Sequence, residues 1–312
     1  MLQLLIIGLL VAAFATIPVA FPWLAFVFTL VLAKGFAALG VAILLRAGLI
    51  SIGHALFYAI GAYTVGFLSQ GAGVDLLIPQ LLAAAAISGV AGLLVGLFMV
   101  RYRGIFFAML NLAVSMVGYT LLSKLYNVTG GTDGLAIATP SVLGMTLSRE
   151  AFEHLLLYGG LGLAVVVCIV AHRYLKSPMG EALSAVETNE IRLEYLGIAV
   201  PRVLLFAYVG SAILAGIGGA IHALAVGHIT PDLAYWTTSG QLVLVAVLGG
   251  IGGVVGPFIG ATFMESVRSF AAIYAPDVWN IIIGAGLLIV IFFLPRGLYG
   301  LIERIGGRRD GQ

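Results

Sequence analysis

The chain has 312 residues, of which 62% are hydrophobic and 9% are charged, and its mean hydropathy is +1.15. About a quarter of the residues in a typical soluble domain are charged, so this composition excludes a water-soluble fold. The formal net charge of +2 is too small and too dispersed for nucleic-acid binding. Cys168 is the single cysteine, which excludes a disulfide framework and a thiolate metal site. We therefore expect no metal ion, no cofactor and no nucleic-acid partner.

Long apolar stretches follow one another along the sequence, and about 20 apolar residues suffice for a helix to cross the hydrocarbon core of a bilayer. The stretches are apolar on every face, which excludes the alternating pattern of a β-barrel. The pattern predicts an all-α integral membrane protein in which residues 1–312 form a single transmembrane domain. The predicted spans are 3–20, 23–45, 50–69, 78–100, 104–123, 155–172, 203–226, 240–274 and 279–295.

The stretch 240–274 is too long for one passage. It contains Gly249-Gly250-Ile251-Gly252-Gly253 and then Gly256-Pro257, a combination that breaks a helix. We expect two shorter helices here, roughly 240–253 and 256–274, and hence about 10 transmembrane helices with broken spans.

Lys and Arg residues concentrate on the cytoplasmic loops of membrane proteins. Ten passages put Arg46, Arg101, Arg103, the basic residues of 173–202 and the basic residues after 295 on the same face. The predicted topology therefore has both ends of the sequence in the cytoplasm. The loop 173–202 is then cytoplasmic, and the turn-rich loop 124–154 is external.

Two short motifs recur loosely in the second half of the chain. Ser51-Ile52-Gly53-His54 is echoed by Ser239-Gly240-Gln241, and Arg103-Gly104-Ile105-Phe106 by Arg296-Gly297-Leu298-Tyr299. Transporters are often built from inverted repeats with discontinuous helices at the solute path. The echo is consistent with such a repeat, although matches this short also arise by chance.

The loop 173–202 holds a concentrated share of the few charged residues in the chain. Ser177-Pro178 is typical of a helix start, Asn189 can cap a second short helix, and Gly197 can end it. The loop is also far longer than a common connection between helices. We expect a compact two-helix element rather than a solvated connector, which is the alternative.

Met179, Leu183 and Val186 share one face of the first of these helices. Leu193 and Leu196 lie close together on the second. We interpret these apolar residues as a surface that docks on a partner.

Three motifs occur in order along the chain: residues 48–64 (GLISIGHALFYAIGAYT), then RGIFFA at 103–108 followed by TGGTDGL at 129–135, then SPMG, ETNE and LGI within 177–198. VLGGIG at 247–252 and LPRGL at 294–298 extend the set, which covers most of residues 35–300. The ordered set resembles the permease subunits of ABC importers for branched-chain amino acids, specifically the LivM-like member of the pair. AILLR at 42–46 departs from the common pattern, which leaves the substrate open.

The resemblance implies an inverted-repeat ABC importer permease fold in the bacterial cytoplasmic (inner) membrane. Its partners would be a paralogous LivH-like permease, two ABC ATPase subunits and an external solute-binding protein. Its substrate would be a branched-chain or related small amino acid, imported by alternating access; urea, amides and small organic acids are the alternatives. The sequence has no G-x-x-x-x-G-K phosphate loop, so the chain is not an enzyme, and ATP hydrolysis is expected on the partner subunits.

Two other classes of function compete with this interpretation. An ion-coupled secondary transporter would need several acidic residues within its spans, and Glu265 is the one clear candidate. An intramembrane enzyme would need a convergent set such as paired aspartates or H-E-x-x-H, and the sequence contains neither. No catalytic residue is therefore predicted.

Lys34 lies near the middle of a predicted span, where an ammonium must be paired or hydrated. A structural pairing with Glu265, or with backbone carbonyls, is the favoured interpretation, and contact with a substrate carboxylate is the alternative. Glu265 can also pair with Arg268 on its own helix face.

Further candidates for lining the translocation path lie at predicted helix breaks. Ser51 and His54 either line the path or satisfy backbone groups freed by the break. Phe57 is a weaker candidate, because packing is its commoner role. Gly249 and Gly250 are candidates because they lie at the break in 240–274.

The resemblance also assigns residues to two partner surfaces. Glu187, Asn189, Glu190 and Gly197 are predicted to couple the ATPases to the membrane domain, as contacts or caps in the loop 173–202. Thr129 and Asp133 are candidates for contact with the binding protein, and a stable turn is the alternative.

Overall fold

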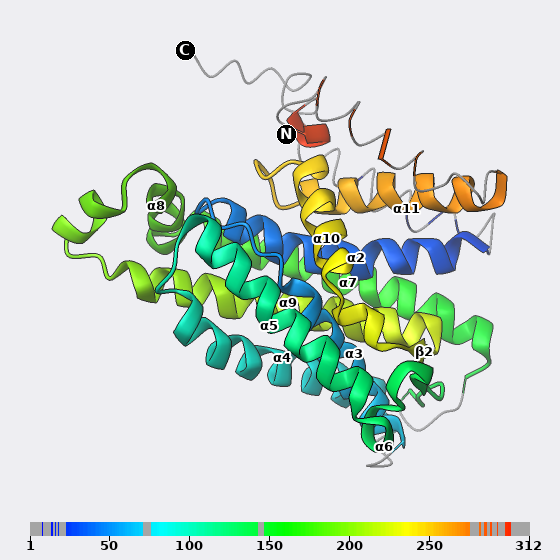
Figure 1. The fold of residues 1–312 in the computed structure, drawn as a ribbon. Helices are drawn as coiled ribbons and strands as arrows, with labels where there is room; N and C mark the ends of the chain where they lie inside the picture. Colours follow the sequence, from blue (N-terminus) through cyan, green and yellow to red (C-terminus); the bar gives the residue numbers. More distant parts are fainter. Residues whose placement is uncertain are drawn as a thin grey trace.

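The computed structural model describes residues 23–70, 76–142, 147–274 and 297–300, with isolated positions among 8–18 and 281–292. Five of the described helices are long and apolar enough to cross a membrane: α2 (Trp23–Leu45), α4 (Leu77–Met99), α5 (Gly104–Lys124), α7 (Arg149–Leu175) and α9 (Val200–Val226). They lie side by side in one bundle (Figure 1). The expected all-α membrane fold is confirmed, and the predicted spans 3–20 and 279–295 lie almost wholly outside the described residues.

Shorter helices complete the bundle. They are α3 (His54–Gln70), α8 (Pro178–Tyr195), α10 (Trp236–Gly249) and α11 (Gly256–Tyr274). The connections hold α6 (Tyr126–Thr129), two 3-10 turns, η1 (Gly131–Asp133) and η2 (Pro231–Ala234), and two short strands, β1 (Leu135–Ala136) and β2 (His228–Ile229). The strands pair antiparallel, with Leu135 opposite Ile229, and join the loop after α5 to the end of α9.

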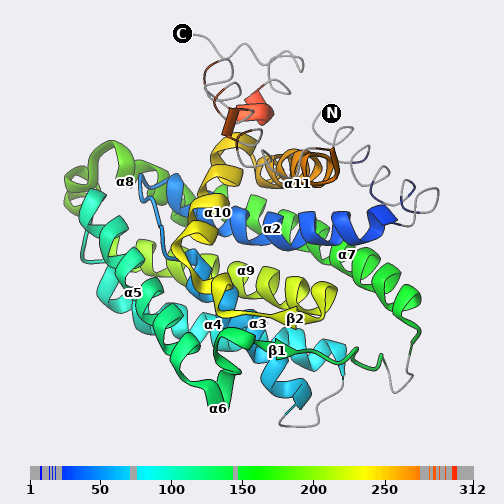
Figure 2. The same cartoon turned by 45° about the vertical axis from the view of Figure 1, so that its right-hand side comes forward.

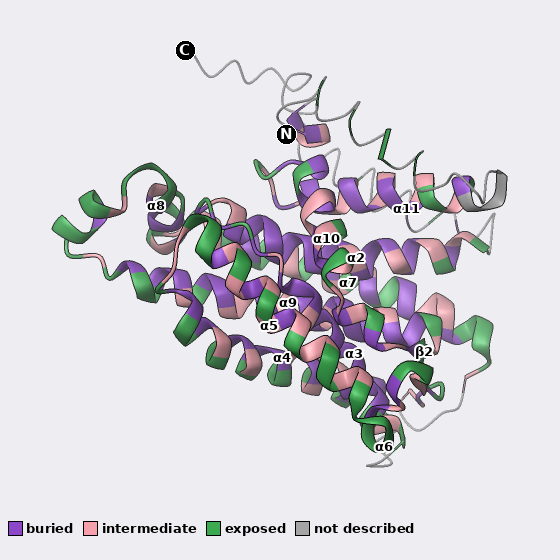
Figure 3. Cartoon of the chain, in the orientation of Figure 1, coloured by how far each residue is buried: buried purple, intermediate pink, exposed green. Residues whose placement is uncertain are grey.

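Helix α9 lies at the centre, with α2 on one side and α3 and α4 on the other (Figure 2). Helix α2 also contacts α7, α10 and α11 and is buried on nearly every side. By contrast, most apolar residues of α4, α5 and α7 are exposed or only partly buried, as the green and pink bands of Figure 3 show for α4 and α5. An apolar surface of this extent is what lipid or another membrane subunit covers.

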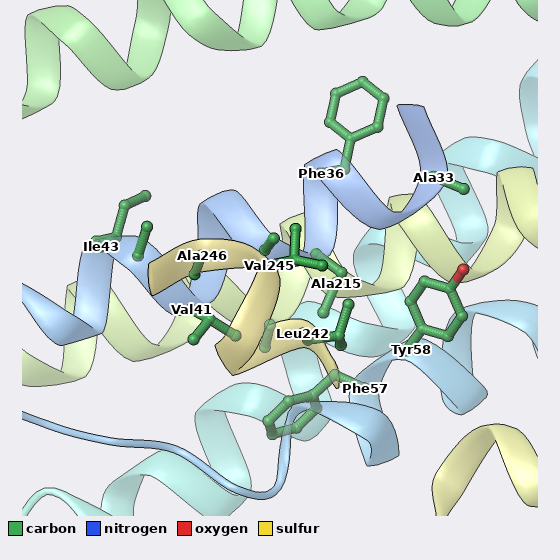
Figure 4. Packing of buried hydrophobic residues seen from close by; sticks show 14 of the residues in the cluster. Ala33, Phe36, Val41, Ile43, Phe57, Tyr58, Ala215, Leu242, Val245 and Ala246 are labelled. Carbon is green, nitrogen blue, oxygen red and sulfur yellow. The ribbon is translucent and has the colours of Figure 1, made fainter. Parts of the chain in front are cut away.

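Glycines allow the central helices to approach closely. A Cβ on Gly219 of α9 would lie 1.8 Å from the carbonyl oxygen of Tyr58, and one on Gly61 of α3 would lie 2.0 Å from that of Gly216. Backbone contact of this kind is how membrane helices gain packing energy, because lipid supplies no hydrophobic driving force between them. Figure 4 shows the result, with side chains of α2, α3, α9 and α10 interleaved at the centre of the bundle.

The predicted break in 240–274 is confirmed. Helix α11 begins at Gly256, as expected, whereas α10 covers 236–249 instead of 240–253. Gly250 has a φ of +95°, and a Cβ on Gly249 would lie 2.0 Å from the carbonyl oxygen of Gly256. The positive φ of Gly250 and the close backbone contact at Gly249 both require glycine. The helix ends at Gly249, and the chain turns back.

Candidate functional site

Helix α3 starts at the buried residue His54, after the segment 46–53, and helix α10 starts at Trp236, directly after β2 and the 3-10 turn η2. Their starts meet, because the backbone N–H of Ala55 donates a hydrogen bond to the hydroxyl of Ser239 at 2.9 Å. A broken helix within a membrane needs such partners for its freed backbone groups. The interrupted spans expected from the sequence are thus adjacent in space.

His54, the first residue of α3, is fully buried between two serines. Its Nδ1 lies 2.8 Å from Ser51 Oγ, and its Nε2 lies 3.0 Å from Ser211 Oγ of α9. The Ser211 hydroxyl donates its proton to the carbonyl of Tyr208 at 2.7 Å, so it must accept from His54. This assigns the proton to Nε2, with Ser51 donating to Nδ1 of a neutral imidazole.

Aromatic rings surround this network. The Phe57 and Tyr208 rings meet edge to face with centroids 5.7 Å apart, and Phe57 is almost completely buried. The Tyr208 hydroxyl donates to Asn111 Oδ1 at 2.5 Å, and the Asn111 amide donates to the carbonyl of Phe107 at 2.8 Å. The network therefore joins α3, α5 and α9. Ser51 and His54 bond to each other, and His54 also bonds to the Ser211 side chain, rather than to backbone groups of the break; a role for them in lining the path stays a prediction.

Lys34 of α2 forms an ion pair with Glu265 of α11, the pairing favoured from the sequence. Arg268 Nη1 lies 4.0 Å from the same carboxylate oxygen. The Lys34 side chain is 12% exposed and that of Glu265 is 4% exposed, so both charges are withdrawn from solvent. Such charges are tolerated inside a membrane protein when they compensate each other.

Gly249 and Gly250 lie away from the start of α3. They end α10, ten residues after Ser239, which corresponds to about 15 Å along the helix. The turn that follows contacts the segment after α2, because Arg46 Nη2 donates to the carbonyl of Gly252 at 2.9 Å. These glycines therefore lie at a different level of the bundle from Ser51 and His54, and their role in lining the path stays a prediction.

Helix α8, shown at one end of the bundle in Figure 1, has the predicted two-part form. The Ser177 hydroxyl accepts from the N–H of Gly180 at 3.4 Å, and the helix bends at Asn189, whose φ and ψ are −164° and 95°. Asn189 Oδ1 then accepts from the N–H of Arg192 at 3.0 Å, which starts the second part. Gly197, with a φ of +79°, follows the end of that part.

Two predicted coupling residues attach α8 to the bundle. Arg103, just before α5, donates through Nε and Nη2 to the two carboxylate oxygens of Glu190, at 2.9 and 2.6 Å. The Glu187 side chain packs over Gly48, which has a φ of +69° and would bring a Cβ to 3.3 Å from Glu187 Cγ. The bend of α8 is therefore fixed to the loop after α2 and to the start of α5.

The apolar face expected to dock on a partner is mostly turned inward. Leu183 and Val186 are buried, Met179 packs against the core, and Leu193 is buried as well. The large apolar side chains that α8 and its end leave open are Ile191, Tyr195 and Leu196, which are 65%, 89% and 69% exposed. Of the two groups named from the sequence, only Leu196 remains on the outer surface, because helix periodicity identifies a face but not what covers it.

Thr129 and Asp133 differ in their surroundings. Thr129 is 2% exposed, and its hydroxyl donates to the carbonyls of Leu122 in α5 and of Leu125 just after it, and accepts from the N–H of Gly131. Asp133 is exposed and accepts a hydrogen bond from the Tyr126 hydroxyl at 3.0 Å. Thr129 thus stabilises the turn, and Asp133 is the member of the pair that lies on the surface.

Residues 23–291 match the protein family described as the permease component of the branched-chain amino acid transport system. The chain belongs to this family. LivM of Escherichia coli, the high-affinity branched-chain amino acid transport system permease protein, is 29% identical over 276 residues, and LivM of Salmonella typhimurium is 28% identical over 274. Each alignment covers 80% of this chain and 64% of the relative, so the chain spans less than two thirds of the LivM proteins it matches.

A second permease is also related to this family member. LivH of Escherichia coli is 28% identical over 142 residues, 45% of each chain. The relatives are thus transport permeases of two kinds. No solved structure matches this chain significantly.

The sequence did not single out several residues that build the site in this family member. Ser211 and Tyr208 lie 157 and 154 positions after His54, and Arg103 lies 87 positions before Glu190. Ser239 and Arg103 carried a signal in that both lie in the short echoed motifs, but nothing in the sequence indicated their partners. The contact between Ala55 and Ser239 brings these two echoing segments together.

Proposed function

We propose that this chain is the membrane permease subunit of an ATP-binding-cassette importer that moves branched-chain or related small amino acids into the cytoplasm. The observation that carries the proposal is the family match over 23–291, together with the similarity to LivM over 80% of the chain. The chain supplies the path, and separate ATPase subunits supply the energy.

The proposed topology has ten spans in the bacterial inner membrane, with 173–202 cytoplasmic and 124–154 external. Its support is that the basic loop after α2 contacts both α8 and the 250–255 turn, through Gly48 and Arg46. On the other side, β1 and β2 join the loops assigned to the outside. The meeting of α3 and α10 is the arrangement that two inverted halves would produce at a shared centre.

The proposed complex contains a LivH-like permease, two ABC ATPases and an external solute-binding protein. Helix α8 is the proposed contact with an ATPase, with Ile191, Tyr195 and Leu196 as its apolar surface. Glu187, Asn189, Glu190 and Gly197 act in this proposal as the residues that keep α8 in its bent form and fixed to the bundle. A stiff element transmits the movement of a partner, whereas a flexible loop absorbs it.

The proposed path runs beside the α3 start, with Lys34, Ser51, His54 and Phe57 near it. Ser51, His54 and Phe57 are almost completely buried, so α3 and α9 must separate before a solute can contact them. Alternating access supplies such a movement. The positive ends of two helix dipoles, at His54 and Trp236, favour a solute that carries a carboxylate.

An ion-coupled secondary transporter is disfavoured by the charges in the bundle. Glu265 is the buried acid among the described residues, and Lys34 already neutralises it. A substrate such as urea, an amide or a small organic acid is the alternative within the family's general architecture.

The test is uptake into proteoliposomes that contain the chain with its neighbouring permease and ATPases, with the loaded binding protein outside. Labelled leucine should accumulate when ATP is sealed inside, and ionophores that collapse proton and sodium gradients should leave the rate unchanged. Accumulation that persists without ATP and stops with the ionophores would reject the proposal in favour of secondary transport.

A further inference from the structure

Four polar side chains from four helices gather where α2, α3, α9 and α11 meet. Lys34 and Glu265 form the ion pair, and the rings of Tyr58 and His222 lie beside each other with centroids 5.6 Å apart. Gly218 lies between the two pairs. A Cβ there would be 2.3 Å from the carbonyl oxygen of Ala33, the residue before Lys34, and 3.3 Å from the Tyr58 ring. Figure 4 shows the Tyr58 hydroxyl pointing from α3 toward the part of α2 that contains Ala33.

Two polar atoms of this cluster lack a partner within the described part of the chain: the Tyr58 hydroxyl and His222 Nδ1. Tyr58 is 2% exposed. Leaving a buried polar atom unpaired costs about 1–3 kcal/mol, and native proteins keep few such atoms. Two such atoms beside a buried ion pair therefore destabilise the bundle unless they gain partners. A bound polar ligand would supply these partners.

The backbone around these atoms is closely packed and holds the side chains in place. Gly218 and Gly219 place the backbone of α9 in direct contact with the backbones of α2 and α3, and a Cβ on Gly219 would overlap the carbonyl of Tyr58. This close packing fixes the Tyr58 ring relative to Lys34. A pre-positioned donor loses little entropy when a ligand binds.

We propose that Lys34, Tyr58, His222 and Glu265 form a transient subsite for the charged head group of a zwitterionic α-amino acid. The ligand carboxylate accepts hydrogen bonds from the Lys34 ammonium and the Tyr58 hydroxyl. The ligand ammonium donates to the Glu265 carboxylate and to Nδ1 of His222. The inference rests on the proposed import function and deepens it by naming the part of the substrate that the permease itself recognises.

The charges of the cluster explain why a zwitterion suits it better than an ion. Lys34 and Glu265 compensate each other, and an ion of either sign would leave an uncompensated charge beside them. A bound zwitterion replaces the Lys34–Glu265 ion pair with two ion pairs, one between Lys34 and the ligand carboxylate and one between Glu265 and the ligand ammonium. The net charge of the cluster does not change. Arg268 lies 4.0 Å from Glu265 and is half exposed.

The decisive variant is Tyr58→Phe, which removes only the hydroxyl. If the hydroxyl is an unused buried group, its removal leaves uptake unchanged and raises the thermal stability slightly. If it holds the substrate carboxylate, uptake at subsaturating loaded binding protein falls by about tenfold while stability stays the same or rises, because a hydrogen bond to a charged group is worth about 1.5–3 kcal/mol.

Tyr63→Phe is the matched control, since Tyr63 belongs to the same helix and its hydroxyl is also buried and unpaired within the described residues. It should import at the wild-type rate. Wild-type uptake by Tyr58→Phe, or an equal loss in both variants, would overturn the subsite. Failure of the wild-type complex to import any amino acid would instead reject the proposed function.

Exchanging the charges of Lys34 and Glu265 distinguishes a role in binding the substrate from a purely structural ion pair. The double variant Lys34→Glu with Glu265→Lys retains an ion pair but reverses the two ends of the site. Assembly with the partner subunits should recover relative to Lys34→Met, whereas uptake should stay at least tenfold below the wild type. Recovery of both assembly and uptake would show that the pair is structural only and would overturn the inference.

Discussion

The Arg103 guanidinium binds both carboxylate oxygens of Glu190, although the two residues lie 87 positions apart. Glu190 directly follows the bend of α8 at Asn189, and Arg103 directly precedes α5. The contact therefore joins the exposed element at the end of the bundle to a membrane-spanning helix. A displacement of α8 by a partner would reach α5 through this pair.

Replacing Glu190 with alanine should weaken coupling without unfolding the chain. Both side chains are about a third exposed, so the ion pair contributes at most about 1 kcal/mol to stability. We expect an unchanged melting temperature and a several-fold fall in solute imported per ATP hydrolysed. Glu194→Ala, on the exposed side of the same helix, should change neither quantity. A wild-type ratio in Glu190→Ala would remove this pair from the coupling path.

The apolar surface of α8 should be needed for ATPase attachment. Replacing Tyr195 and Leu196 with serine removes two large side chains that are 89% and 69% exposed and that contribute little to the fold. The ATPase subunits should then dissociate during purification of the complex. Val128→Ser, at a 58% exposed residue of the loop assigned to the outside, is the control. Full retention of the ATPases by the double variant would contradict the assignment.

The central glycines should tolerate no side chain. Gly219→Ala places a methyl group 1.8 Å from the carbonyl of Tyr58, and the neighbouring backbone cannot yield as a side chain can. We expect a loss of about 1–3 kcal/mol or more, measured as a lower melting temperature in detergent. Gly210→Ala, in the same helix but with nothing within 4 Å, should melt at or above the wild-type temperature. Equal melting of the two variants would contradict the close packing of α3 and α9.

The contact between the two broken helices should stabilise the bundle. Ser239→Ala removes the acceptor of the Ala55 N–H and leaves that group buried without a partner, which costs about 1–3 kcal/mol. Ser184→Ala, on the exposed side of α8, is the matched control and should have almost no effect. Hydrogen exchange at Ala55 should also accelerate in Ser239→Ala alone, and unchanged exchange would show that another group satisfies this amide.

Local signals in the sequence predicted the features that depend on neighbouring residues. The start of α11 at Gly256, the cap at Ser177 and the bend at Asn189 each depend on residues within one turn of helix. The Lys34–Glu265 pair was also predictable, because a lone intramembrane charge demands a partner and few were available.

Features that depend on which helices are neighbours could not be predicted in this way. Leu183 and Val186 form an apolar face in the sequence, but only the packing of α8 against α9 shows that this face is buried. Thr129 resembled a surface residue because it lies among turn residues, yet its hydroxyl is buried at the end of α5. The unpaired atoms of Tyr58 and His222 likewise have no signal in a sequence, since pairing is a property of the assembled bundle.

We propose that this chain moves solute with energy that other chains deliver through α8. The most direct test replaces residues 178–196 with a flexible Gly–Ser segment of the same length and measures leucine uptake by the complete complex with ATP sealed inside the vesicles. We expect uptake to fall to the level seen without ATP, while the chain remains folded in the membrane. Leucine accumulation at the wild-type rate would contradict it.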